Sequence, residues 1–330
     1  MDWALVFRWS FLVSLVVAGI RLAVPVLLAV LGEIITERSG ILNLGLEGIM
    51  AVGGLAGFVV AYTLENGPLS AGGGAWIAWL GLGGGMLAGM AMGALMAFLC
   101  VTLRTDQVIS GITLVVFGVG ISDYFYRQAF STLTARVSGL ELFPVPGLSR
   151  IPVLGEMLFN HQPPVYLTVL LVVGVWYLLS RTTWGLNIRA VGQNPAAAET
   201  SGVNVERIRY AATVVGAGLV GLGGAVLSVV QLRLYREGIM AGRGWIAVAL
   251  VIFARWRPSL ALVGALLFGL ADSLQYRIQA LSQLDRGVGA IPYEFLLMLP
   301  YVLTLLALLW QRGRSERPAA LGEPYVKEAR

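Results

Sequence analysis

The sequence predicts an all-α, polytopic integral membrane protein with about 8–10 transmembrane helices. Of its 330 residues, 57% are hydrophobic and only 12% are charged, whereas soluble domains carry about 25% charged residues. Apolar runs of about 20 residues, enough to cross a bilayer as a helix, recur along the chain. The 42 glycines agree with this class, because glycine is frequent in transmembrane helices and lets them approach closely.

Nine apolar segments are candidates for membrane spans. They cover residues 11–31, 44–62, 76–101, 108–126, 165–179, 210–231, 245–254, 260–275 and 295–310. The first contains Arg21, which favours an interfacial piece followed by a span. The segment 245–254 is too short to cross a bilayer alone and is predicted to be half of a broken helix.

Arginine placement indicates which loops face the cytoplasm, since cytoplasmic loops of membrane proteins are rich in Lys and Arg. Basic residues gather in the loop 180–209, in the turns at Arg104 and 255–257, and after Arg312. The net charge of +5 comes almost entirely from arginine. We interpret this charge as a signal of membrane topology. We therefore expect the protein to lie in the lipid bilayer and not to bind a nucleic acid.

Alternating the spans between these basic points divides the chain into two parts. A transmembrane domain is expected over residues 1–312, with the loops 65–75 and 127–164 outside. The polar residues 313–330 are expected to form a disordered cytoplasmic tail, because they are charged and contain two prolines.

Rare residue types exclude several kinds of site. Cys100 is the single cysteine and His161 the single histidine. No intramolecular disulfide, cysteine-rich metal site or His-based nucleophile system is therefore expected, which argues against a membrane-embedded enzyme. His161 lies among prolines in a polar loop, and we expect it at the surface.

The most polar interior segment is 184–209, and it contains a short helix with both ends marked. Asn194 is placed to cap its N-terminus with a side-chain oxygen. Pro195 follows at the first helical position, where its missing N–H costs nothing. Gly202 suits the left-handed conformation that ends a helix. A helix this short is marginal in water, so it needs a partner surface.

Small residues spaced by four predict two close-packing helix faces. One face carries four glycines and the other carries two alanines and a glycine: Gly81, Gly85, Gly89 and Gly93, and Ala217, Gly221 and Ala225. A five-residue match, EGIMA at 47–51 and again at 237–241, indicates either an inverted repeat around a central pathway or a chance identity in a biased composition.

Four segments together resemble a known family. They are GEIITERSGILNLGLEGIMAVGG (32–54), RTDQVISG (104–111), GLNIRAVGQNPAAAETSGVNV (185–205) and GRGWIAVALVIFARWRP (242–258). They look like the membrane permease subunit of bacterial ABC importers, in the branch that serves ribose-like sugars, branched-chain amino acids and nucleosides. The resemblance runs in order from about Leu22 to Trp310. The form ERSGILNLGLEGIM is most similar to the nucleoside and simple-sugar permeases.

The resemblance implies a role for the short polar helix. Permeases of this kind dock a cytoplasmic coupling helix into a cleft of an ATPase subunit, and here it would be residues 193–202. The residues expected to contribute to coupling are Arg189, Gly192, Gln193, Asn194, Pro195, Ala197, Glu199 and Gly202.

The partners follow from the same resemblance. The chain has no GxxxxGK[ST] phosphate loop, so ATP and Mg²⁺ are expected on a separate ATPase subunit, with no cofactor bound by this chain. A second permease subunit, identical or paralogous, and an extracytoplasmic solute-binding protein complete the expected assembly.

Polar and aromatic residues within apolar spans are the candidates for a substrate pathway: Asn43, Glu47, Thr113, Phe117, Gln231 and Trp245. Asn43 and Glu47 lie four residues apart, where they either bond a solute or cap a half-helix. Thr113 and Gln231 otherwise form helix–helix hydrogen bonds. Phe117 and Trp245 either stack on a base or sugar, or face lipid.

These observations lead to one functional expectation and two alternatives. We expect a multi-pass permease of the bacterial inner membrane that imports nucleosides, with simple sugars and then branched-chain amino acids as the alternative substrates. The alternative of another class is a stand-alone facilitator or ion-coupled transporter. It leaves the capped cytoplasmic helix without a role, and the spans lack a clear acid–base relay.

Overall fold

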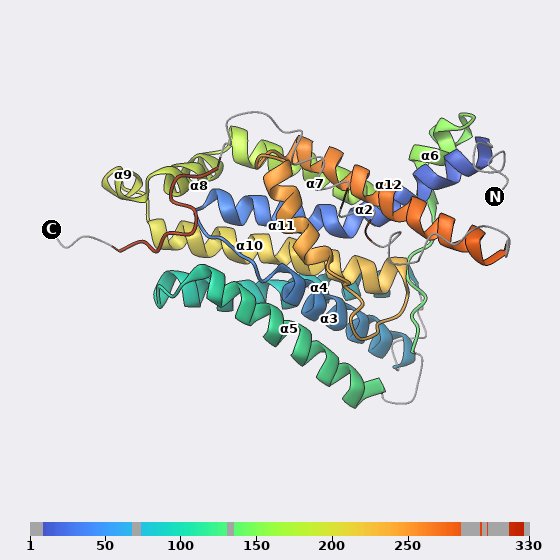
Figure 1. Cartoon of the computed structure of the whole chain (residues 1–330), viewed down its shortest axis with the longest axis horizontal. Helices are drawn as coiled ribbons and strands as arrows, with labels where there is room; N and C mark the ends of the chain where they lie inside the picture. Colours follow the sequence, from blue (N-terminus) through green and yellow to red (C-terminus); the bar gives the residue numbers. More distant parts are fainter. Residues whose placement is uncertain are drawn as a thin grey trace.

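The computed structural model describes residues 9–67, 74–130, 135–284, 298, 302 and 317–326. Within them the chain is a bundle of helices with a small two-stranded sheet at the end where the described chain begins (Figure 1). Seven helices in the described part are long and apolar enough to cross a membrane. They are α2 (Trp9–Arg38), α3 (Leu46–Asn66), α4 (Ala75–Ala97), α5 (Gln107–Phe130), α7 (Pro163–Arg181), α10 (Val205–Ala225) and α12 (Pro258–Leu284).

Shorter elements extend or connect these helices. Two π-helices, η2 (Phe98–Thr102) and η4 (Val226–Gln231), prolong α4 and α10. The remaining elements are β1 (Phe143–Pro144), η3 (Leu148–Arg150), α6 (Leu154–Phe159), β2 (Asn160–His161), α8 (Thr183–Gln193), α9 (Pro195–Thr200) and α11 (Arg243–Phe253). β1 and β2 pair antiparallel.

Eight of the predicted apolar segments lie in the described residues, and each forms a helix. The ninth, 295–310, lies outside the described residues except for positions 298 and 302. The predicted break near Arg21 is wrong, because α2 continues as one helix through Arg21 and Pro25. The guanidinium of Arg21 donates to the carbonyl oxygen of Asn160 at 3.5 Å, so its charge has a polar partner at the end of the bundle.

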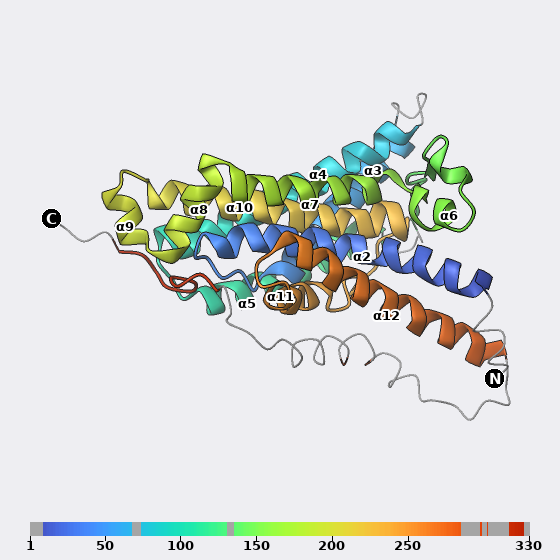
Figure 2. The same cartoon turned by 90° about the horizontal axis from the view of Figure 1, so that it is seen from above.

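α11 is the predicted half-helix. It has 11 residues, about 16 Å at the rise of an α-helix, which is too short to span a bilayer. Figures 1 and 2 show that it lies across the direction of the long helices. Its N-terminus contacts α3, and the turn after it contacts the end of α2, where the Trp256 indole donates to the Glu37 carboxylate.

The two small-residue faces predicted from the sequence pack against each other. A Cβ added at Gly89 of α4 would collide with the carbonyl oxygen of Ala217 and lie 2.8 Å from the Cα of Gly221 on α10. α10 lies at the centre of the bundle, since 89% of the residues in its most apolar stretch are buried. Close backbone approach between α4 and α10 therefore holds the core together.

The helices that flank the two EGIMA copies run in opposite directions, as an inverted repeat requires. α2 runs toward α9, whereas α10 runs back from α9, and α4 and α12 are likewise antiparallel (Figures 1 and 2). α10 packs against α3 and α4, and α2 packs against α11 and α12. Helices from before the first long loop and from after it therefore pack against one another rather than as two separate bundles.

The two ends of the bundle differ from expectation at two places. His161 is fully buried rather than at the surface, and burial lowers the pKa of its imidazole. Residues 317–326, expected in a disordered tail, are folded against α8, α9 and the end of α2. Pro318, Ala320 and Leu321 are buried there. Their burial stabilises this segment although the rest of the tail is polar.

Candidate functional site

The short helix α9 forms with the caps that its sequence specifies. The side-chain oxygen of Asn194 accepts from the backbone N–H of Ala197 at 3.0 Å, and Pro195 occupies the first turn. Gly202 has φ +86°, and the next N–H, of Val203, donates to Ala198 O at 3.1 Å. The left-handed glycine closes the C-terminus, as expected for this motif.

One side of α9 is apolar and packs on the bundle, and the opposite side is exposed. Ala198 is buried in a cluster with Val191 of α8 and Val205 of α10. Gln193, Asn194, Ala197 and Gly202 are exposed, while Arg189, Pro195 and Glu199 are half-buried. α9 lies at one end of the described bundle (Figure 1), where another protein can reach its exposed residues.

Gly192 differs from the other predicted coupling residues, because it is buried. A Cβ added there would collide with the carbonyl oxygen of Arg38 and lie 3.3 Å from the backbone nitrogen of Gly40. This glycine therefore lets α8 approach the end of α2, and a partner does not reach it.

Glu47 caps the half-helix. Its two carboxylate oxygens accept from the backbone N–H groups of Gly242 at 2.8 Å and Gly244 at 2.6 Å, at the start of α11. The N–H groups at a helix start have no partner within the helix, and a carboxylate there also meets the positive end of the helix dipole. Of the two roles considered for Glu47, the structure shows this one.

Asn43 lies in the unwound segment between α2 and α3. Its backbone N–H donates to Glu33 at 3.0 Å, and its side-chain oxygen accepts from Gly45 N at 3.0 Å. The neighbouring Leu42 N–H donates to the side chain of Gln107 at 2.7 Å. Sequence reasoning missed Gln107 as a partner, although it stands within the RTDQVISG motif. The contacts hold an extended segment in place inside the bundle.

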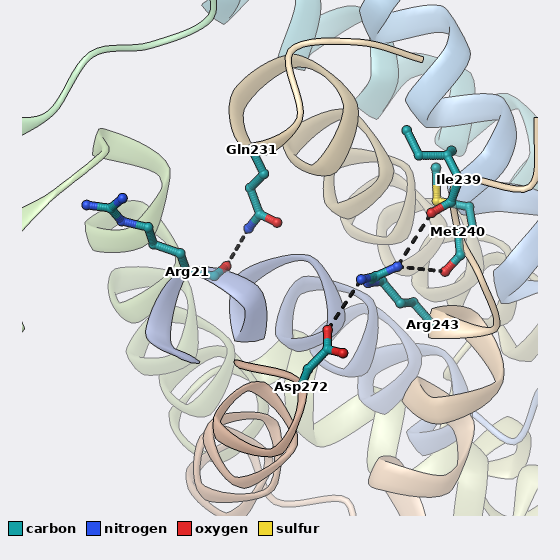
Figure 3. A network of polar contacts seen from close by, with 6 residues as sticks. All are labelled: Arg21, Gln231, Ile239, Met240, Arg243 and Asp272. Carbon is teal, nitrogen blue, oxygen red and sulfur yellow. Dashed lines mark hydrogen bonds and ion pairs between the residues drawn. The ribbon is translucent and has the colours of Figure 1, made fainter. Parts of the chain in front are cut away.

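The remaining candidates fall into two groups. Thr113 and Phe117 lie on the exposed face of α5, and Trp245 is exposed on α11. The Thr113 hydroxyl donates to Ile109 O of its own helix at 2.8 Å. Gln231 lies at the end of η4, where its amide donates to the carbonyl oxygen of Arg21 (Figure 3).

A second polar contact lies near Gln231, and sequence reasoning did not predict the part of Arg243 in it (Figure 3). Arg243 at the start of α11 donates to Asp272 of α12 at 3.4 Å and to the carbonyl oxygens of Ile239 at 3.4 Å and Met240 at 3.2 Å (Figure 3). Both charged side chains are about nine-tenths buried. The pair fastens α11 and the loop before it to α12, and the position of Arg243 in the GRGW motif is the signal that could have indicated it.

Comparison with known proteins identifies the family. Residues 15–308 match the family described as "Branched-chain amino acid transport system / permease component". The chain belongs to this permease family. The match covers every described long helix except the first few residues of α2.

Curated relatives align along nearly the whole permease. It is 42% identical to a putative glucose ABC transporter permease of Haloferax volcanii, over 97% of this chain and 99% of the relative. It is 35% identical to a guanosine ABC transporter permease of Bacillus subtilis, over 96% and 97%. It is 34% identical to a nucleoside ABC transporter permease of Lactococcus lactis, over 92% and 93%. No solved structure matches the chain.

An exposed ion pair closes the loop before α11 onto α5. Arg127 donates to both carboxylate oxygens of Glu237 at 2.6 Å, and this hydrogen bonding lowers the pKa of Glu237 below its usual range. A carboxyl group whose pKa is lowered by folding contributes stability above its unfolded pKa. That contribution is lost as the pH falls through the folded pKa.

We expect Glu237→Gln to lower thermal stability slightly at pH 7, because exposed ion pairs contribute little. The difference from the unmodified permease should shrink as the pH falls below about 4, the usual pKa of a glutamate, and vanish below the lowered pKa of folded Glu237. Melting curves of the purified permease between pH 3 and 7 measure it. Glu141→Gln, also exposed, is the control, and a difference that persists unchanged at low pH contradicts the prediction.

Proposed function

We propose that this chain is the membrane subunit of an ATP-driven importer that moves nucleosides across the inner membrane of a bacterium. Two relatives that match along more than nine-tenths of the chain are named as guanosine and nucleoside ABC permeases. The observation that carries the importer role is α9, a capped helix of six residues presented at one end of the bundle. It is too short to be stable without a supporting surface.

The assembly in this proposal has four kinds of chain. An ATPase subunit receives α9 and supplies the ATP and Mg²⁺ chemistry, so that this permease is not itself catalytic and binds no cofactor. A second permease, identical or paralogous, completes the pathway. An extracytoplasmic binding protein delivers the solute to the opposite end, where the loop 135–162 and the end of α3 lie.

A simple sugar is the second candidate for the solute. The relative from Haloferax volcanii, a putative glucose permease, has 42% identity to the chain, more than the nucleoside permeases. A nucleoside carries a ribose, so both candidates present sugar hydroxyl groups, and they differ in the base. Stimulation of ATP hydrolysis by the assembled importer, with its binding protein and either guanosine or glucose, distinguishes them.

The role of α9 is tested by a charge on its exposed side. Ala197→Glu is expected to lower uptake and ATPase co-purification at least about tenfold, because about 1.4 kcal/mol of lost docking energy suffices for that factor. Membrane insertion should be unchanged, since Ala197 is exposed. Thr183→Glu, also exposed but on α8, is the control.

The outcome separates an ABC permease from a stand-alone transporter. Normal uptake by Ala197→Glu in cells that contain the permease at its usual level contradicts docking through α9. Uptake that persists without any ATPase subunit favours the facilitator instead.

A further inference from the structure

Residues 317–326, the C-terminal strap, bind three separate parts of the chain. Ala320 N donates to Gly192 O of α8 at 2.9 Å, and Gly322 N donates to Gly40 O after α2 at 3.1 Å. The guanidinium of Arg209, in the first turns of α10, donates to Glu323 O at 3.1 Å. Each of these three partners lies more than 100 residues from the strap in the chain.

The strap also covers α9. The hydroxyl of Tyr325 donates to the carboxylate of Glu199, and its ring packs on the cluster around Ala198. A groove of about 1210 Å³ runs between α9 and residues 319–326, with Glu199 and Tyr325 among its lining residues. Because six helical residues are not stable alone, this cover helps to fix the position of α9.

The contact between Gly322 of the strap and Gly40 leads into the membrane domain. Gly40 has φ +93°, and a Cβ there would lie 2.9 Å from a guanidinium nitrogen of Arg209. Gly40 lies in the unwound segment 39–45, which contains Asn43 and leads directly into α3, where Glu47 stands in the first turn. Glu47 in turn caps α11. One continuous chain of contacts thus runs from α9 through the strap to the half-helix.

We propose that the strap is a positioning element of coupling, which passes the displacement of α9 to the unwound segment 39–45 and so to α11. The inference rests on the proposed docking of an ATPase at α9. The strap acts through Glu199 and Gly40 and leaves the exposed side of α9 free. Its loss should therefore separate ATP hydrolysis from transport, whereas loss of the docking surface removes both.

The first test is truncation of the permease after residue 316, in the complete importer. The ATPase subunit should still co-purify, while uptake per ATP hydrolysed falls about tenfold, within the range seen when coupling networks are broken. Unchanged uptake per ATP overturns the proposal. Loss of ATPase co-purification also overturns it, because the strap would then be part of the docking surface.

A double-mutant cycle tests the same proposal if the truncated chain fails to fold. Glu199→Ala and Tyr325→Phe should each lower uptake per ATP several-fold, and the double variant should be no worse than either one, because both remove the same contact. Glu199→Gln, whose amide oxygen still accepts from Tyr325, should recover most of the ratio. Additive losses overturn the proposal. Val326→Ala, exposed beside Tyr325, is the control and should keep the normal ratio.

The cycle is independent of the docking test. If Ala197→Glu keeps both uptake and ATPase co-purification, the proposed function fails whatever the strap does. If Ala197→Glu loses both and the cycle is additive, the function stands and the strap has no part in coupling.

Discussion

Gly89→Leu is expected to prevent the permease from reaching its folded state in the membrane. A single added Cβ would already collide with the carbonyl oxygen of Ala217 and lie 2.8 Å from the Cα of Gly221. These are backbone atoms, which cannot move aside as a flexible side chain can. α4 and α10 would have to separate, and α10 is the most buried helix of the described bundle.

The expected cost is large because overpacking a core by a few atoms already costs about 1–3 kcal/mol. Leucine adds four heavy atoms at a backbone contact, so we expect the upper end of that range or more. The yield of monodisperse permease in detergent should fall at least about tenfold, which corresponds to about 1.4 kcal/mol. Yield and melting temperature measure the effect.

Gly83→Leu is the matched control for this prediction. Gly83 lies on the same helix, and a Cβ added there meets nothing within 4 Å. Leucine also has a higher helix propensity than glycine. We expect normal yield for Gly83→Leu, and normal yield for Gly89→Leu would show that the described α4–α10 packing is wrong.

Glu47→Ala is the prediction with the second largest effect. It leaves the N–H groups of Gly242 and Gly244 without their acceptor at the start of α11. Each buried donor that loses its partner costs about 1–3 kcal/mol, so the loss is about 2–6 kcal/mol. We expect α11 to be displaced, with a lower melting temperature and a loss of uptake of at least about 30-fold.

Glu237→Ala is the control, because Glu237 holds the same position in the second EGIMA copy but is exposed. It should cost little. Glu47→Gln distinguishes the cap from a solute-binding role. An amide keeps one acceptor oxygen, so the cap predicts an intermediate loss of stability. A Glu47→Gln permease that is fully stable, with only a raised KM for solute, would show that Glu47 acts on the solute and not as a cap.

The sequence was sufficient for features that depend on neighbouring residues. Apolar runs predicted eight described helices, because the bilayer requires about 20 apolar residues to cross. Asn194, Pro195 and Gly202 predicted α9, since capping involves residues within one turn. The four-residue spacing from Gly81 to Gly93 predicted a close-packing face for the same reason.

The tertiary structure decided which of these features meet. It paired the glycine face of α4 with that of α10, and it placed the carboxylate of Glu47 at an α11 start that lies 195 residues later. It also folded Tyr325 onto Glu199, in a stretch whose polar composition predicted disorder. Composition and spacing describe what one segment prefers, whereas the contacts between distant segments depend on how all the helices fill space together.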